Sequence, residues 1–340
     1  MPPMRPIACP VCDLKDAPPL LEQEIPPLGR LRLVRCPGCG LGYLDPQPEP
    51  SEMAPFYARD YYGGETAKFE PLIEALRDRM GRSRARRLIK GLTAGARVLD
   101  VGCGDGRLLA AFTALGCEGV GTERRDDHPR PGRSACEAEI LAGDLAQIEL
   151  PEAHFDLCVY WHVIEHLHDP RGSLLAARRA LRPEGRLVIA VPNLASVQAG
   201  LARERWFHLD LPRHLFHFTP ASLAALLGRT GFRVERVTHY SLEQNPFGIL
   251  QSALNRFGGA GALYEILKGT RRDTPLARRI ALRGAFILGM PLAAVLATLE
   301  SLAGRGGTIE VWASPARTGE PASPAGRSPA SSARPGAAAR

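Results

Sequence analysis

The sequence predicts an α/β fold built on a parallel sheet, with a small cysteine-rich module before it and a helical segment near its end. Strand-like apolar runs alternate with helix-like segments from residue 97 to about residue 240. A glycine-rich turn follows the first of these runs. Two Cys-x-x-Cys pairs stand near the N-terminus, which adds a metal-binding module to the prediction.

Composition and charge place the chain among ordinary globular proteins. Of its 340 residues, 45% are hydrophobic and 23% are charged, which excludes fibrous, collagenous and wholly disordered proteins. The formal net charge is +7, but residues 314–340 hold four arginines and one glutamate and so supply +3 of it. The basic balance therefore does not by itself indicate a nucleic-acid partner. Because no apolar leader precedes the cysteines, we expect a reducing, cytoplasmic environment.

The chain divides into four predicted segments. We expect a zinc ribbon over residues 1–45 and a linker with a helix over 46–95. The α/β domain should cover 96–313, with a helical insertion at 241–306 before its last strand. Residues 314–340 are rich in Pro, Ser, Ala and Gly, so we expect a disordered tail.

The cysteine pairs predict a structural zinc site. Cys9 and Cys12 form the first pair, and Cys36 and Cys39 form the second. Two such pairs can place four thiolates tetrahedrally around one Zn²⁺. Since all four positions are cysteines, no position stays open for a water molecule, and a redox-active role is the less favoured alternative.

Six apolar runs are predicted as strands of the main sheet. They are bounded by turn residues and are rich in Val, Ile, Leu and aromatic residues. They cover residues 97–101, 118–122, 155–161, 186–191, 232–238 and 308–312.

The first strand leads into the glycine loop. Gly102, Gly104 and Gly106 follow Asp100, and a helix-like segment begins at Arg107. Glycine permits positive φ and a close approach of a ligand to the backbone. The spacing lacks the third glycine of a dinucleotide fingerprint, and an acid beside the loop would attract a cation rather than a phosphate.

This loop resembles motif I of class I S-adenosylmethionine-dependent methyltransferases, and the resemblance continues to about residue 240. It implies a Rossmann-like sheet of seven strands and S-adenosylmethionine as methyl donor. Asp100 and the three glycines would form the donor site. Glu123 matches the acid that accepts the ribose hydroxyls, and Asp144 matches the acid near the adenine amino group. Residues 124–137 depart from the family, because they are short for its usual helix and third strand.

A histidine-rich segment follows the strand at 155–161. His162, Glu165 and His166 are spaced so that they would share one face of a helix. Their order also matches the inverted zinc-protease pattern, which we reject because the segment follows a buried strand of a methyltransferase-like sheet. In the resembling families this segment lies beside the methyl group, so His162 or His166 is a candidate general base. Alternatively, the Glu-His pair only closes the loop over the donor.

Residues 206–219 resemble the acceptor loop of small-molecule methyltransferases related to ubiquinone-biosynthesis O-methyltransferases. Arg213, His214 and His217 could bind an anionic or hydroxylated acceptor, and His214 is a third candidate base. The alternative is a folded loop in which Thr219 caps the next helix.

Taken together, these motifs predict methyl transfer from S-adenosylmethionine to oxygen or carbon of a small-molecule, sugar or lipid-linked acceptor. The alternatives are an RNA base methyltransferase guided by the zinc ribbon and a non-catalytic donor-binding scaffold. Nucleic acid is the less favoured partner, because positions 192–193 read Pro-Asn and no Asn-Pro-Pro-Tyr-like tetrad is present.

The insertion ends in an apolar run. Residues 284–299 carry no charge, and five arginines and one aspartate precede them within 271–283. A full membrane span is not expected, since the run is short, contains Pro291 and must return to the sheet. Two readings remain: a lid packed over the acceptor site, or an interfacial helix pair that contacts anionic lipid through 271–302. The second reading gives a peripheral position at the inner face of the membrane.

Overall fold

The computed structural model describes residues 7–57, 71–124, 138–257, 261–268 and 274–317. Within them, a seven-stranded sheet forms the centre of the molecule, in the order β10-β11-β8-β7-β4-β5-β6. Its strands are β4 (Arg97–Val101), β5 (Glu118–Glu123), β6 (Glu139–Ala142), β7 (Phe155–Trp161), β8 (Leu181–Pro192), β10 (Phe232–Thr238) and β11 (Thr308–Pro315).

The pairing of the strands explains where a site can form. β4 pairs in parallel with β5 and β7, and β7 pairs in parallel with β8. Only β11 runs against its neighbours, β8 and β10. The chain crosses from the β5 side to the β7 side at β4, and in open α/β sheets such a switch point opens a crevice at the carboxyl ends of the strands.

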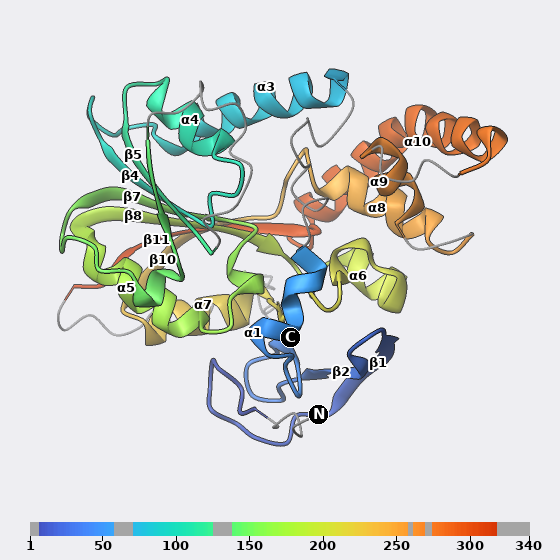
Figure 1. Cartoon of the computed structure of the whole chain (residues 1–340), viewed down its shortest axis with the longest axis horizontal. Helices are drawn as coiled ribbons and strands as arrows, with labels where there is room; N and C mark the ends of the chain where they lie inside the picture. Colours follow the sequence, from blue (N-terminus) through green and yellow to red (C-terminus); the bar gives the residue numbers. More distant parts are fainter. Residues whose placement is uncertain (1–6, 58–70, 125–137, 258–260, 269–273, 318–340) are drawn as a thin grey trace, which may run out of the picture.

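Helices cover both faces of this sheet, as Figure 1 shows. α3 (Pro71–Leu88) and α4 (Arg107–Thr113) lie on one face, and α5 (Pro170–Ala180) and α7 (Pro220–Arg229) lie on the other. Successive strand residues alternate between the two cores: Val98 packs with Phe112 of α4, whereas Leu99 belongs to the core on the opposite face. Because both faces are covered, the strands are apolar on both sides.

A second sheet of four strands, in the order β1-β2-β3-β9, carries the cysteine module. The module supplies β1 (Pro19–Ile25), β2 (Gly29–Arg35) and β3 (Gly42–Leu44). The fourth strand, β9 (Phe216–His217), comes from the segment that was expected to be an acceptor loop. Gly42 is required at this contact, because a Cβ there would lie 2.9 Å from Leu194 and 3.1 Å from His217.

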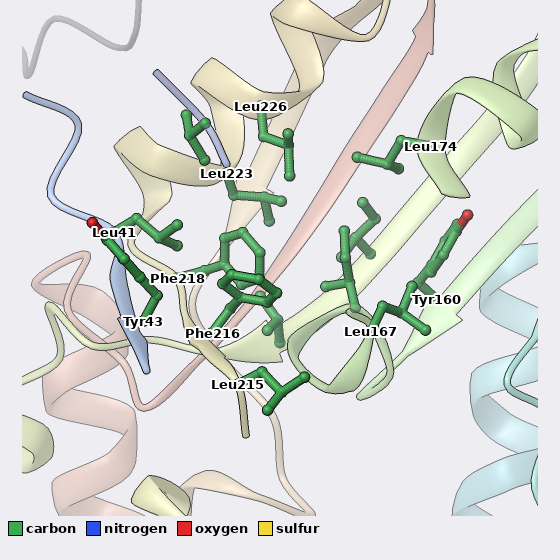
Figure 2. Close-up of a cluster of buried hydrophobic side chains, with 14 of the residues drawn as sticks. Leu41, Tyr43, Tyr160, Leu167, Leu174, Leu215, Phe216, Phe218, Leu223 and Leu226 are labelled. Atoms are coloured by element: carbon green, nitrogen blue, oxygen red, sulfur yellow. The ribbon is translucent and has the colours of Figure 1, made fainter. Parts of the chain in front are cut away.

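The two sheets share one hydrophobic core. Figure 2 shows Leu41 and Tyr43 of the module beside Phe216 and Phe218, with Leu223 and Leu226 of α7 next to them. All six side chains are fully or almost fully buried. The cysteine module is therefore packed into the methyltransferase-like sheet rather than tethered to it.

Shorter helices connect these parts. α1 (Pro50–Met53) and the 3-10 helix η1 (Ala54–Tyr57) lie in the predicted linker, and α6 (Val197–Ala202) follows β8. The other 3-10 helices are η2 (Leu145–Gln147), η3 (Ile164–His166), η4 (Arg203–Arg205) and η5 (Phe207–Leu209).

Beside the sheet lies a helical lobe formed by α8 (Asn245–Leu254), α9 (Ala262–Leu267) and α10 (Leu276–Leu302). α10 is one helix of 27 residues that continues through Pro291. Its buried residues Ala293, Ala297 and Glu300 form a narrow stripe, and near Gly289 it packs closely on Leu250 of α8. By length and composition it could cross a membrane, and only 11% of its most apolar window is buried. The expected lid with its apolar face buried is therefore not what the structure shows.

The seven-stranded fold and all six predicted strands are confirmed, and β6 is added to them. Two expectations were wrong. Residues 162–166 do not begin a helix: η3 is a single 3-10 turn, and α5 starts at Pro170 because Asp169 caps it by accepting a 2.7 Å hydrogen bond from Gly172 N. The tail was expected to begin at 314, but β11 continues through Pro315 and pairs with Phe232. Residues 318–340 of the predicted tail and 125–137 lie outside the described residues.

Candidate functional site

A cavity of about 460 Å³ opens at the carboxyl ends of β4, β5 and β7. Its wall includes Gly102 and Gly104 of the glycine loop, Glu123 at the end of β5, and Asp144 before η2. His162 and His166 also line the cavity. The structure thus brings together six of the residues that the sequence predicted for the site.

The glycine loop has the backbone conformation that only glycine adopts easily. Gly102, Gly104 and Gly106 have φ of 65°, 55° and 74°. A Cβ on Gly102 would collide with Val163 at 2.5 Å, whereas a Cβ on Gly104 would meet no atom within 4 Å. The backbone at Gly104 is therefore open toward the cavity, and any side chain there would occupy its space.

Two carboxylates line the cavity. Glu123 accepts hydrogen bonds of 2.9 Å from the backbone N–H of Gly104 and of Arg124, which fixes it against the glycine loop. Asp144 caps η2 by accepting a 3.1 Å hydrogen bond from Ala146 N. Among the described residues of the wall, these two negative charges exceed the single positive charge of Arg124. The cavity therefore favours a cationic ligand.

Asp100 and Gly106 lie behind the cavity rather than in its wall. Gly106 is the N-cap of α4. Asp100 is 2% exposed, and its Oδ2 atom has no hydrogen-bond partner among the described residues. Burial raises the pKa of Asp100 to about 7, although the charge of Arg84 opposes this shift.

His162 has the geometry of an oriented base. It follows β7 with φ 56°, a conformation that a non-glycine residue adopts only when its surroundings impose it. Its Nδ1 atom lies 3.5 Å from Glu165 Oε1. Its Nε2 atom is buried and has no hydrogen-bond partner among the described residues, while the side chain lines the cavity.

Glu165 is a buried carboxylate that faces histidines. It is fully buried, and burial alone would raise its pKa. The contact with His162 and the electrostatic effect of the neighbouring histidines oppose burial and lower the pKa of Glu165 to about 2, although no side chain lies within hydrogen-bond geometry of its carboxylate among the described residues. Glu165 is therefore ionised and can hold the His162 ring in one orientation.

His166 and His214 are held by backbone carbonyl groups. His166 Nδ1 lies 2.9 Å from Arg213 O, and His214 Nδ1 lies 2.8 Å from His208 O. Each ring therefore donates through Nδ1, because a carbonyl oxygen can only accept. Both rings lie near Glu165, with one ligand atom from each of the three residues within 4.8 Å of the others, a spacing that a metal ion could also use. Of the two histidines, only His166 reaches the cavity wall.

The expected acceptor loop is mostly buried. His214 is 7% exposed and His217 is 2% exposed, and Arg213 is paired with Asp210 through Nε at 2.9 Å. Burial lowers the pKa of His214 to about 3 and that of His217 to about 4, so both rings are neutral. Neither Arg213 nor His217 lines the cavity, and the pairing of β9 with β3 draws His217 into the core, so their part in acceptor binding stays a prediction. The alternative is confirmed for Thr219, which caps α7.

The four cysteines of the module converge on one point. Cys9 Sγ and Cys39 Sγ are 3.5 Å apart, and Cys12 Sγ and Cys36 Sγ are 3.3 Å apart. A tetrahedral Zn²⁺ with bonds of about 2.3 Å separates its sulfur ligands by roughly 3.7 Å, so the cluster fits a structural zinc site. In contrast, Cys103 is buried in the glycine loop and Cys158 in β7, and burial raises the pKa of both thiols well above the usual range.

Sequence reasoning missed one wall of the cavity. Pro50, Met53 and Tyr57 come from the predicted linker, and all three line the cavity. The Tyr57 hydroxyl donates a 3.3 Å hydrogen bond to Arg213 O, the same carbonyl that holds His166. The only signal for this wall was the aromatic pair at 56–57.

Comparison with known proteins agrees with this geometry. Residues 72–237 match a family described as "Methyltransferase domain", which is slightly less than half of the chain. A protein of Mycolicibacterium smegmatis named "Probable S-adenosylmethionine-dependent methyltransferase" is 33% identical over 153 residues, covering 42% of this chain and 54% of that protein. A "Ubiquinone biosynthesis O-methyltransferase" of Xanthomonas axonopodis pv. citri is 28% identical over 157 residues, covering 43% and 66%.

The chain therefore covers less than two thirds of either relative's own length. Among solved structures, the cyclase SpnF superposes with a TM-score of 0.50 at 17% identity, covering 79% of this chain and 98% of that chain, which supports the fold alone. The predicted resemblance to class I S-adenosylmethionine-dependent methyltransferases is confirmed.

Proposed function

We propose that this chain, whose residues 72–237 match a methyltransferase domain, transfers a methyl group from S-adenosylmethionine to a small-molecule acceptor. The observation that carries the proposal is the shared wall of one cavity: the open glycine loop, the carboxylate of Glu123 and His162 all line it. A donor held at one side would thus present its methyl group toward a base at the other.

The residues present fit the donor. The sulfonium of S-adenosylmethionine carries a positive charge and supplies an already activated methyl group. Gly104 leaves room for a ligand against the backbone, and Glu123 and Asp144 give the wall its negative charge. By the resemblance, Glu123 would accept the ribose hydroxyls and Asp144 would lie near the adenine.

His162 would take the proton that the acceptor loses. Its Nε2 atom faces no protein partner among the described residues, and Glu165 holds its Nδ1 atom. An acceptor O–H or acidic C–H placed at Nε2 could therefore transfer its proton as the methyl group arrives. Glu165 would act as a positioning residue, because it stabilises the protonated ring without reaching the cavity. His166 would orient the acceptor, and His214 would support His166 from behind.

Donor binding tests the first half of the proposal. Gly104→Val should weaken the affinity for S-adenosylmethionine by more than about a hundredfold in calorimetry, since the new side chain fills the site. Gly116→Val is the matched control: Gly116 also has positive φ (82°) and open space around it, but it lies outside the cavity. Equal affinity of the Gly104 and Gly116 variants would contradict the donor site.

Turnover on a panel of hydroxylated acceptors tests the second half. His162→Ala should lose about a hundredfold or more in rate while donor affinity stays within threefold. His154→Ala, outside the cavity, is the control. Glu165→Gln should shift the pH profile of the rate, which a purely structural role would not do. A fully active His162→Ala variant would remove the base from the proposal.

The environment of Asn193 favours a small-molecule acceptor over an RNA base. Asn193, which with Pro192 makes the only Pro-Asn pair considered for a base-flipping tetrad in the sequence, is 1% exposed. Its amide donates a 2.9 Å hydrogen bond to Gly306 O, and its carbonyl accepts one of 3.0 Å from Ala195 N. The Asn193 side chain therefore supports the return of the chain to β11 and is not available to a base.

We further propose that α10 contacts anionic lipid without crossing the membrane. Exposed apolar side chains follow its whole length, among them Leu276 (70%), Leu288 (80%) and Leu302 (81%). Three arginines stand in its first two turns, and its sequence holds no acid before Glu300. Since β11 starts six residues after α10 and pairs with β8, both ends of the helix stay on one side of the bilayer. This position would suit a lipid-linked acceptor.

A further inference from the structure

A second concave surface lies next to the donor cavity. This groove, of about 710 Å³, runs between α3 and the half of the sheet formed by β8, β11 and β10. Trp161 lines the groove, and the next residue, His162, lines the donor cavity. The two spaces therefore approach each other at the carboxyl end of β7, although they share no lining residue.

The groove has an excess of positive charge. Its lining holds five cationic side chains and two carboxylates: Arg84, Arg87, Lys90, Arg186, Arg236, Glu243 and Glu310. Both carboxylates are already paired. Glu243 pairs with Arg84, and Glu310 accepts from Arg87, with one Nη2–Oε2 distance of 2.7 Å. Within the described chain, Lys90, Arg186 and Arg236 have no carboxylate partner, so three positive charges remain.

Aromatic rings hold the guanidinium groups in place. Arg236 lies over the ring of Trp312, with Cζ 4.6 Å from its centroid, and Arg186 reaches the same ring at 5.9 Å. Arg186 also donates a 3.0 Å hydrogen bond to the backbone carbonyl of Lys90, which ties β8 to the chain just after α3. A guanidinium stacked on a ring keeps its N–H edge available for the oxygens of an anion.

The groove also contains an unsatisfied buried hydroxyl. Thr308 is 2% exposed and lines the groove, and its Oγ1 atom has no hydrogen-bond partner among the described residues. A buried hydroxyl without a partner is unfavourable, and a ligand oxygen could satisfy it. Thr308 pairs with Pro192, six residues along β8 from Arg186, so the hydroxyl and the unpaired cations occupy different parts of the groove. The guanidinium and ammonium groups are donors suited to phosphate oxygens.

We infer that this groove binds the phosphate or diphosphate group of the methyl acceptor. This inference rests on the proposed function, because it places the reacting end of the acceptor at His162 and its anionic end across Trp161. The acceptor class is then a phosphorylated metabolite, either a soluble nucleotide-linked sugar or a lipid-linked diphosphate. Both kinds of acceptor would present phosphate oxygens to Lys90, Arg186 and Arg236.

Calorimetric titration with inorganic pyrophosphate at low salt tests the groove without any methyl transfer. The wild-type protein should bind it, and Arg186→Gln/Arg236→Gln should weaken binding at least tenfold. Arg82→Gln/Arg86→Gln is the matched control: it removes the same charge from exposed positions on α3 that do not line the groove. No binding to the wild type, or equal loss in both double variants, would overturn the inference.

Further probes separate the sources and the alternatives. Geranyl diphosphate binding more tightly than pyrophosphate indicates a lipid-linked acceptor, and UDP binding more tightly indicates a soluble nucleotide; either result supports the groove. If a single-stranded RNA oligonucleotide bound to the protein and pyrophosphate did not, the inference would be overturned in favour of a nucleic-acid surface. S-adenosylmethionine affinity measured on the same variants should stay unchanged, so failure of the groove is distinguishable from failure of the donor site.

Discussion

The cysteine module and the helical lobe of α8, α9 and α10 are both additions to the seven-stranded sheet, and they are attached in opposite ways. The module adds β3 to β9 and shares a continuous core with α7. The lobe packs through a narrow stripe on α10 and leaves its apolar face exposed. A part that buries its apolar surface within its own chain serves stability, whereas a part that leaves such a surface open is suited to a partner.

Removing the metal should therefore have the largest effect. Cys36→Ser should abolish zinc binding and leave little folded protein, because the module and the large sheet share one core. Treating the wild-type protein with a chelator should lower its melting temperature strongly. The expected zinc content is one equivalent per chain by metal analysis. If chelated protein kept its melting temperature, the module would not be integral to the fold. A second equivalent of zinc in the metal analysis would indicate metal binding at Glu165, His166 and His214.

A smaller effect is expected from the shared core itself. Phe216 is 1% exposed, and Phe216→Ala should cost about 3–5 kcal/mol in the free energy of unfolding. Zinc release and loss of secondary structure should occur in one transition in denaturant. Two separate transitions would show that the module and the sheet unfold independently. Leu201→Ala, on a side chain that is 75% exposed, is the control and should change little.

The buried histidines near β9 should make stability fall in acid. Burial lowers the pKa of His208 and His217 to about 4 and that of His214 to about 3, below the unfolded value near 6.5. Their contribution is complete above pH 6.5 and is lost as the pH falls toward 4, because the unfolded chain binds protons first. His217→Gln should reduce the loss of stability between pH 7 and 5 by on the order of 2 kcal/mol. Chemical denaturation at both pH values measures it; an unchanged slope would contradict it.

The smallest effect on stability is expected at α10. Leu288 and Leu292 are 80% and 64% exposed, so Leu288→Glu/Leu292→Glu should change the free energy of unfolding by only about 0.5 kcal/mol. The same change should abolish cosedimentation with vesicles that contain anionic phosphatidylglycerol. Leu201→Glu, on α6, is the matched control and should still bind. Wild-type protein that stays in the supernatant, or that forms a dimer through α10, would contradict the lipid contact.

The two additions also differ in how well the sequence predicts them. The strands, the glycine loop and the cysteine spacing depend on local patterns, so the fold and the residues of one cavity wall could be predicted. The pairing of β3 with β9 joins positions more than 170 residues apart, and no local pattern indicates it. For that reason residues 206–219 were taken for an acceptor loop. Likewise, the helix expected at 162–166 failed because Asp169 and Pro170 begin α5 later.

The pairing of β3 with β9 bears on how such chains can be recombined. Leu44 N donates to Leu215 O, and Leu215 N donates to Glu165 O, so a line of backbone hydrogen bonds runs from the module to the backbone of Glu165, the residue behind His162. A chimera that exchanges residues 1–45 alone would place a foreign β3 against the native β9. Residues 206–219 would have to be exchanged together with the module. These two stretches, although distant in the sequence, therefore form one unit for recombination and for design.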